Sequence, residues 1–118
     1  MAQYKHLPIY KATYDLLLKV TEATRHYPRD FKHSTGAMLR DEVMYVVLLI
    51  YRANASRQQR AEITAEIVER LQVIELLLRL SNDMRFISPK QFSSIVVMTD
   101  AIVRQAAGWH RSTSASAE

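Results

Sequence analysis

The sequence predicts an all-α fold, and more narrowly an antiparallel up-down-up-down four-helix bundle. Apolar residues recur at steps of three and four over four long segments, the pattern of an amphipathic helix. Turn-forming residues separate these segments at helix-length intervals. The 118 residues include only two Gly and three Pro, too few to separate many short strands. We therefore expect a single four-helix bundle domain over residues 1–110, with short connections that alternate between its ends.

The first two predicted helices cover about residues 9–27 and 36–54. Pro8 suits the first turn of the first helix, because its missing N–H group would have no intrahelical partner there. In the second segment, apolar residues follow one another at steps of four and three from Leu39 to Ala53, which is typical of a coiled-coil seam. Each segment thus has one face to bury.

The third and fourth predicted helices cover about residues 59–81 and 89–108. The fourth has the clearest start, because Ser88 and Gln91 occupy the N-cap and N3 positions of a capping box. A Gly-Trp pair ends its apolar seam. The small, polar residues 111–118 have nothing to bury, so we expect them to form a flexible polar tail.

The apolar content exceeds what a monomeric bundle needs. The run Val43–Tyr51 is apolar around the whole helix, and four leucines between positions 76 and 80 widen the third seam. A helix that is apolar all round must be covered on all sides, so we expect a homo-oligomer. The alternative is that these residues are scattered surface apolars, which are normal when single. The predicted interface residues are Tyr45, Leu48, Tyr51, Leu76 and Leu77.

Basic residues gather at both ends of the predicted bundle, and the net charge of the chain is +4. Arginine can hold phosphates through bidentate hydrogen bonds, so these ends are candidates for contact with a nucleic acid or a polymerase. The alternative is that they complement the dipoles of C-terminal helix ends. The candidates are Arg29, Lys32, Arg79, Arg85 and Lys90 at one end, and Arg52, Arg57 and Arg60 at the other.

Catalytic and metal-binding patterns are missing from the sequence. There is no Cys, and the four His form neither an H-E-x-x-H motif nor the paired Glu-x-x-His motifs of a di-iron bundle. We expect no catalytic residue, no metal and no cofactor. The longest apolar run has nine residues, about half of the ~20 that a membrane span needs. The first residues lack the apolar core of a signal peptide, so we expect a cytoplasmic protein without a membrane partner.

Several short motifs, in this order and spacing, resemble a known family. They are Y-P-R at 27–29, G-A-M-L-R-D-E at 36–42, I-S-P-K-Q-F at 87–92 and G-W at 108–109. They are similar to the four-helix proteins related to the 23S rRNA intervening-sequence proteins, and more narrowly to the accessory variability determinant (Avd) proteins of diversity-generating retroelements. Residues 52–56 lack the Glu-Gly with which the intervening-sequence branch usually ends its second helix, which favours the Avd branch.

The resemblance implies a non-catalytic accessory subunit. Avd-like proteins form ring-shaped homo-pentamers with basic surfaces, bind the reverse transcriptase of the element, and engage its template RNA or RNA/DNA hybrid during mutagenic cDNA synthesis. The alternative within the same family is a structural or interaction protein of the intervening-sequence type with no nucleic-acid role. A small metal or hydrolytic enzyme is disfavoured, because the sequence has no matched set of ligands.

Overall fold

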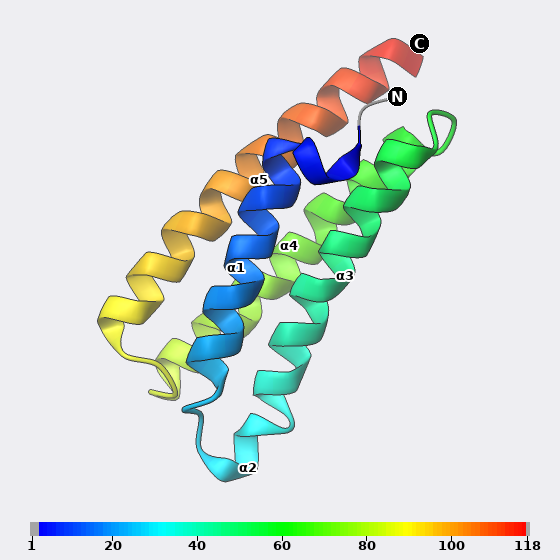
Figure 1. Ribbon diagram of the computed structural model, residues 1–118. Helices are drawn as coiled ribbons and strands as arrows, with labels where there is room; N and C mark the ends of the chain where they lie inside the picture. Colours follow the sequence, from blue (N-terminus) through cyan, green and yellow to red (C-terminus); the bar gives the residue numbers. More distant parts are fainter. Residues whose placement is uncertain (1–2, 118) are drawn as a thin grey trace.

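The computed structural model describes residues 3–117 of the chain, and its regular elements are all helical. Four long helices form a four-helix bundle, an elongated body of 47 × 20 × 20 Å (Figure 1). The prediction of an all-α fold is therefore confirmed. The elements in chain order are η1 (Tyr4–His6), α1 (Pro8–Thr24), α2 (Arg29–Lys32), α3 (Thr35–Ala55), α4 (Arg60–Asp83) and α5 (Pro89–Ala117).

Each long helix packs against two others. The helix α3 lies against α1 and α4, and α5 completes the bundle by lying against the same two helices. The connection 56–59, η1 and the last turns of α5 lie together at one end of the bundle, which we call the terminal end (Figure 1). The opposite end carries α2 and the connection 84–88, and we call it the α2 end.

The core consists of apolar side chains that recur at steps of three and four along the four long helices. Leu16 and Ile67, for example, are completely buried. Several buried threonine and serine hydroxyls interrupt this apolar core, and each donates a hydrogen bond to a backbone carbonyl of its own helix. Thr13 donates to the carbonyl of Ile9 at 2.7 Å, and Thr99 donates to that of Ile95 at 2.8 Å. These threonine hydroxyls are therefore buried in the bundle with their hydrogen bonds formed.

The predicted capping box at the start of α5 is present. The Gln91 N–H donates to Ser88 Oγ at 3.1 Å, and the Ser88 N–H points back to Gln91 Oε1 at 3.5 Å. The preceding connection turns at Arg85, the one non-glycine residue with a positive φ (61°) among the residues described. This turn and the cap together fix where α5 begins.

The helix boundaries differ from the prediction at two places. The first helix ends at Thr24, and a separate single-turn helix, α2, follows it. The predicted helix end at Gly108 is wrong, because α5 continues to Ala117 through most of the predicted polar tail. A contact with α4 explains this continuation, since Thr113 Oγ1 lies 3.3 Å from Thr64 Oγ1. Residue 118 of the predicted tail, and residues 1–2 of the predicted domain, lie outside the described residues.

Candidate functional site

Three of the predicted basic residues meet at the terminal end. Arg52 lies in the last turn of α3, Arg57 in the connection that follows, and Arg60 at the first residue of α4. Arg52 and Arg57 are exposed, whereas Arg60 is half-buried. The tight connection between α3 and α4 is what brings these three positions together.

Arg60 has a structural role that the sequence did not reveal. Its Nε donates to the carbonyl of Ala53 at 2.8 Å, and its Nη2 donates to that of Asn54 at 3.1 Å. Both carbonyls belong to the last turn of α3, where backbone oxygens lack intrahelical partners. A basic side chain in this position also complements the negative end of the helix dipole. Arg60 therefore caps α3 from the next helix, and its guanidinium is held in one place.

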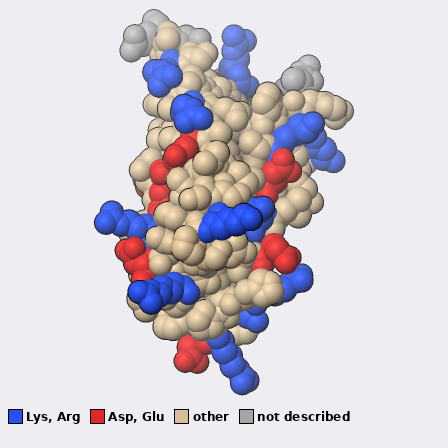
Figure 2. All heavy atoms as spheres, turned by 90° about the vertical axis from the view of Figure 1, so that its left-hand side faces the viewer, with Lys and Arg blue, Asp and Glu red and all other residues tan. Residues whose placement is uncertain are grey.

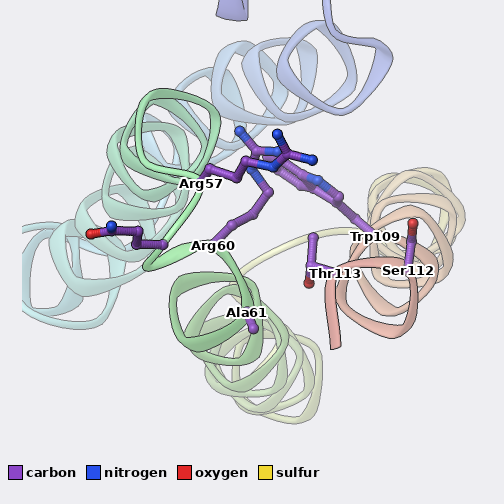
Figure 3. Close-up of a pocket in the computed structure, with 7 residues that line it drawn as sticks. Arg57, Arg60, Ala61, Trp109, Ser112 and Thr113 are labelled. Carbon is purple, nitrogen blue, oxygen red and sulfur yellow. The ribbon is translucent and has the colours of Figure 1, made fainter. Parts of the chain in front are cut away.

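A small pocket opens beside these arginines. It has a volume of about 260 Å³, and its lining includes Arg57, Arg60, Trp109 and Thr113. In the close-up of Figure 3, the side chain of Arg57 from the connection 56–59 and that of Arg60 from the first residue of α4 both extend toward the indole of Trp109 on α5. The described lining residues include two guanidinium groups and no carboxylate, so the pocket favours an anion.

A buried polar network lies next to this pocket. Thr64 Oγ1, which is fully buried on α4, donates to the carbonyl of Arg60 at 2.8 Å and lies 3.0 Å from His110 Nδ1. Thr113 Oγ1 donates to the carbonyl of His110 at 3.0 Å. The network fixes the last turns of α5 against the first turn of α4.

The α2 end holds the other five predicted basic residues, on several different elements. They are Arg29 and Lys32 of α2, Arg79 of α4, Arg85 of the connection 84–88, and Lys90 of the first turn of α5.

Acidic side chains accompany the basic ones at the α2 end. Arg79 Nε lies 3.9 Å from Asp83 Oδ2, and Glu22 lies within 4 Å of both Arg25 and His26. On the face shown in Figure 2, acidic and basic residues alternate over the middle and lower part of the molecule, and the uppermost charged residues are basic. The positive charge at the α2 end is therefore partly neutralised, unlike that around the pocket.

The predicted interface residues do not form one surface. Leu77, predicted to lie in an oligomer interface, is only 6% exposed and packs in the core, so it offers little surface to another subunit. Its neighbour Leu76 is 65% exposed on α4. The third seam carries too many leucines for the sequence alone to tell which of them face inward.

Tyr45 is half-buried between α3 and α4. Its hydroxyl donates to Glu66 Oε2 at 2.7 Å, and this hydrogen bond is the main reason why the pKa of Tyr45 is raised. Arg70 Nη1 bridges the same two helices by pairing with Glu42 Oε1 at 3.2 Å. Tyr45 is thus part of a polar contact within the chain rather than a bare apolar surface.

Leu48 and Tyr51 belong to an exposed apolar surface that continues onto α1. Its members are each more than 40% exposed, and we call them the apolar strip: Tyr14, Leu18, Met44, Leu48 and Tyr51. Aromatic contacts connect its two halves.

Tyr4 of η1 joins the two halves of the strip. Its ring meets the rings of Tyr10 and Tyr51 edge-on, with centroids 5.3 and 5.0 Å apart, and Tyr10 stacks on Tyr14 at 6.2 Å. The α1 half was not predicted, although Tyr10, Tyr14 and Leu18 recur at steps of four in the sequence. That second stripe on one helix was the signal that could have revealed it.

Within residues 3–117, no group of three or more His, Asp or Glu side chains is arranged to hold a metal ion. None of the helices described is both long and apolar enough to cross a membrane.

Comparison with protein families identifies a relationship. A family model described as bAvd-like matches residues 7–113, which include most of the described chain and all of α1, α3 and α4. No match was found among curated proteins.

Proposed function

The chain belongs to the bAvd-like family and is an accessory protein of the Avd type; from this premise, we propose that it binds the reverse transcriptase of a diversity-generating retroelement together with its template RNA or an RNA/DNA hybrid. In this role it supports mutagenic cDNA synthesis in the cytoplasm and catalyses no step itself. The proposal includes an antiparallel arrangement of the bundle and its assembly into a homo-pentamer through the apolar strip.

Positive charge at the terminal end supports contact with RNA. Arg52 and Arg57 are exposed there, and Arg60 stands beside them in a pocket whose described lining has no carboxylate. Guanidinium groups bind phosphate oxygens strongly, and each neutralised phosphate releases bound counterions. A ring repeats these contacts in every subunit, so it raises the effective concentration of the template near the polymerase.

The α2 end suits a protein partner better than a polyanion. Arg29, Lys32, Arg85 and Lys90 lie there among acidic residues such as Asp83. A surface of mixed charge can pair with complementary charges of both signs on another protein, which favours specific docking over non-specific attraction. We assign the reverse transcriptase to this end.

The decisive experiment measures the affinity for labelled template RNA by fluorescence anisotropy over a range of salt concentrations. We expect log K to fall linearly with log salt, by about 0.7 for each phosphate contacted on a single strand. The double charge reversal Arg52→Glu with Arg57→Glu should weaken binding at least tenfold, because it replaces attraction by repulsion. Arg29→Glu at the α2 end is the matched control and should have a much smaller effect.

The same variants test the assignment of the two ends. Arg29→Glu should weaken the complex with co-expressed reverse transcriptase, measured by light scattering, while leaving RNA affinity largely intact. Equal loss of RNA affinity in both variants would contradict the assignment. A chain that binds neither RNA nor the polymerase would instead favour the structural alternative without a nucleic-acid role.

A further inference from the structure

The pocket at the terminal end has the chemistry of a site for a single unpaired nucleotide. We propose that it takes one nucleotide of single-stranded RNA, with the base stacked on the indole of Trp109 and the adjoining phosphate held by Arg57. This inference rests on the proposed function, and it adds to it a defined site and a preference for unpaired RNA.

The phosphate side of the pocket consists of one exposed guanidinium and one that is held by hydrogen bonds. Arg57 is exposed in the connection 56–59, and among residues 3–117 its side chain makes no hydrogen bond or ion pair. Arg60 is held by the carbonyls of Ala53 and Asn54, so its charge stays beside the pocket at no further entropic cost. Arg57 is therefore available to close on a phosphate, while Arg60 keeps the local potential positive.

The indole of Trp109 forms the side of the pocket that is proposed to bind the base, and the core holds it in place. Trp109 is half-buried, packs against the hydrophobic core and lines the pocket, so its ring is partly covered by protein and partly open to a ligand. Unpaired bases stack on such aromatic side chains without a requirement for one sequence.

The size of the pocket decides between a nucleotide and a larger ligand. Its volume of about 260 Å³ lies just below the ~300–1,000 Å³ of pockets that hold drug-sized molecules. The bases of a duplex are stacked on one another and cannot reach an aromatic side chain in a pocket, whereas an unpaired base can be splayed out. A flexible single strand therefore fits the site, and a blunt duplex does not.

Trp109 makes the test direct, because it is the only tryptophan in the chain. The full-length protein is titrated with a pyrimidine pentaribonucleotide, a short blunt RNA duplex or inorganic phosphate while tryptophan emission is recorded. We expect saturable quenching with the pentanucleotide and little change with the other two probes. Equal quenching by the duplex or by phosphate would overturn the inference.

A second readout separates this inference from the proposed function. Binding of labelled template RNA is followed by anisotropy in the same samples. If the template binds but tryptophan emission stays unchanged, the pocket is not the base-stacking site, and the accessory function stands. If the template does not bind at all, the RNA part of the proposed function fails as well.

Matched substitutions test each half of the pocket by anisotropy with the labelled pentanucleotide. Arg57→Gln should weaken binding about tenfold through loss of a charge-assisted contact. Arg104→Gln, which removes an exposed arginine of α5 that is outside the pocket lining, should weaken it less than about twofold. Equal losses in these two variants would indicate non-specific charge attraction and would overturn the inference.

The indole is tested in the same way. Trp109→Phe keeps an aromatic face and should retain most of the affinity, whereas Trp109→Leu should lose about tenfold. Circular dichroism checks that both variants fold. Because Trp109 also packs on the core, the Arg57→Gln comparison decides the question if Trp109→Leu is unfolded. Unchanged affinity in a folded Trp109→Leu variant would overturn the stacking role.

Discussion

At the scale of single residues, neighbouring arginines at the terminal end have different roles. Arg60 bonds two carbonyls at the end of α3, whereas Arg57 has no such bond within the described residues. Arg60→Gln should therefore lower the free energy of unfolding by about 1–2 kcal/mol, because buried acceptors lose a charged donor. Arg57→Gln should change it by less than about 0.5 kcal/mol. Urea unfolding followed by circular dichroism measures both, and equal losses would contradict the capping role.

Glu75 of α4 makes the free energy of unfolding depend on pH. Burial, then the charge of Asp100 on α5 and a hydrogen bond to it, raises the pKa of Glu75 above its ordinary value of 4.5. In this case the folded state binds the proton more tightly than the unfolded state. The contribution of Glu75 to the free energy of unfolding is therefore fully present at low pH. It is lost as the pH rises from about 4.5 through the raised pKa of Glu75.

Substitutions at this pair separate the causes of the shift. Glu75→Gln should remove this loss and raise stability at pH 7 by about 0.3 kcal/mol, a typical size for relief of a like-charge pair on helices. Asp100→Asn should recover only part of it, because burial, the largest cause, remains. Thermal unfolding at pH 4.5 and pH 7 measures both variants. A larger gain from Asp100→Asn than from Glu75→Gln would show that burial is not the main cause.

At the scale of elements, α5 is the helix whose length departs most from expectation. Gly108 usually marks a helix end, but here it lies inside the helix without a positive φ. A Cβ added there would meet only Arg111 Nη2, at 3.8 Å. Gly108→Ala should therefore stabilise the protein by about 0.5–1 kcal/mol, because alanine loses less backbone entropy in a helix.

Gly36 is the matched comparison for Gly108. A Cβ added at Gly36 would lie 3.4 Å from Phe31 O, Thr24 Cβ and Tyr27 Cδ2, so it has far less room. Gly36→Ala should gain less stability than Gly108→Ala, or none. Thermal unfolding of the two variants measures the difference, and a destabilised Gly108→Ala variant would contradict a continuous α5.

Local sequence patterns were sufficient to predict where the helices lie. Features that depend on contacts between distant segments of the chain were not predicted. Steps of three and four located α3 and α4 to within two residues, and the capping box located the start of α5. The continuation of α5 depends on a contact between Thr64 and Thr113, which are 49 positions apart. The candidate site follows the same rule. The basic residues at this end could be predicted because they lie near the ends of predicted helices, but the pocket that Arg57 and Trp109 share could not.

At the scale of the whole molecule, the apolar strip is the feature that a lone bundle does not explain. Single exposed apolar side chains are normal, but a continuous strip over two neighbouring helices is typical of an interaction surface. Its position on α1 and α3 leaves the pocket, which α4 and α5 form with the connection 56–59, on other elements. The chain therefore separates the surface proposed for assembly from the pocket proposed for an unpaired nucleotide.

This separation leads to a prediction about assembly. Leu48→Glu places a charge in the middle of the α3 half of the strip, and burying an unpaired carboxylate is strongly unfavourable. We expect light scattering to show a pentamer for the unchanged protein and a smaller species for Leu48→Glu. Val97→Glu on α5 is the control, because Val97 is 68% exposed outside the strip, and this variant should keep the mass of the unchanged protein.

The same pair of variants tests whether assembly multiplies weak contacts with RNA. If each subunit offers one weak site, affinity for a long template should fall far more in Leu48→Glu than affinity for a pentanucleotide, because only the long template spans several subunits. Val97→Glu should change neither affinity beyond the effect of its added charge. If Leu48→Glu lowers the mass but leaves the affinity for the long template unchanged, RNA binding does not depend on the ring, and the apolar strip serves only to join subunits.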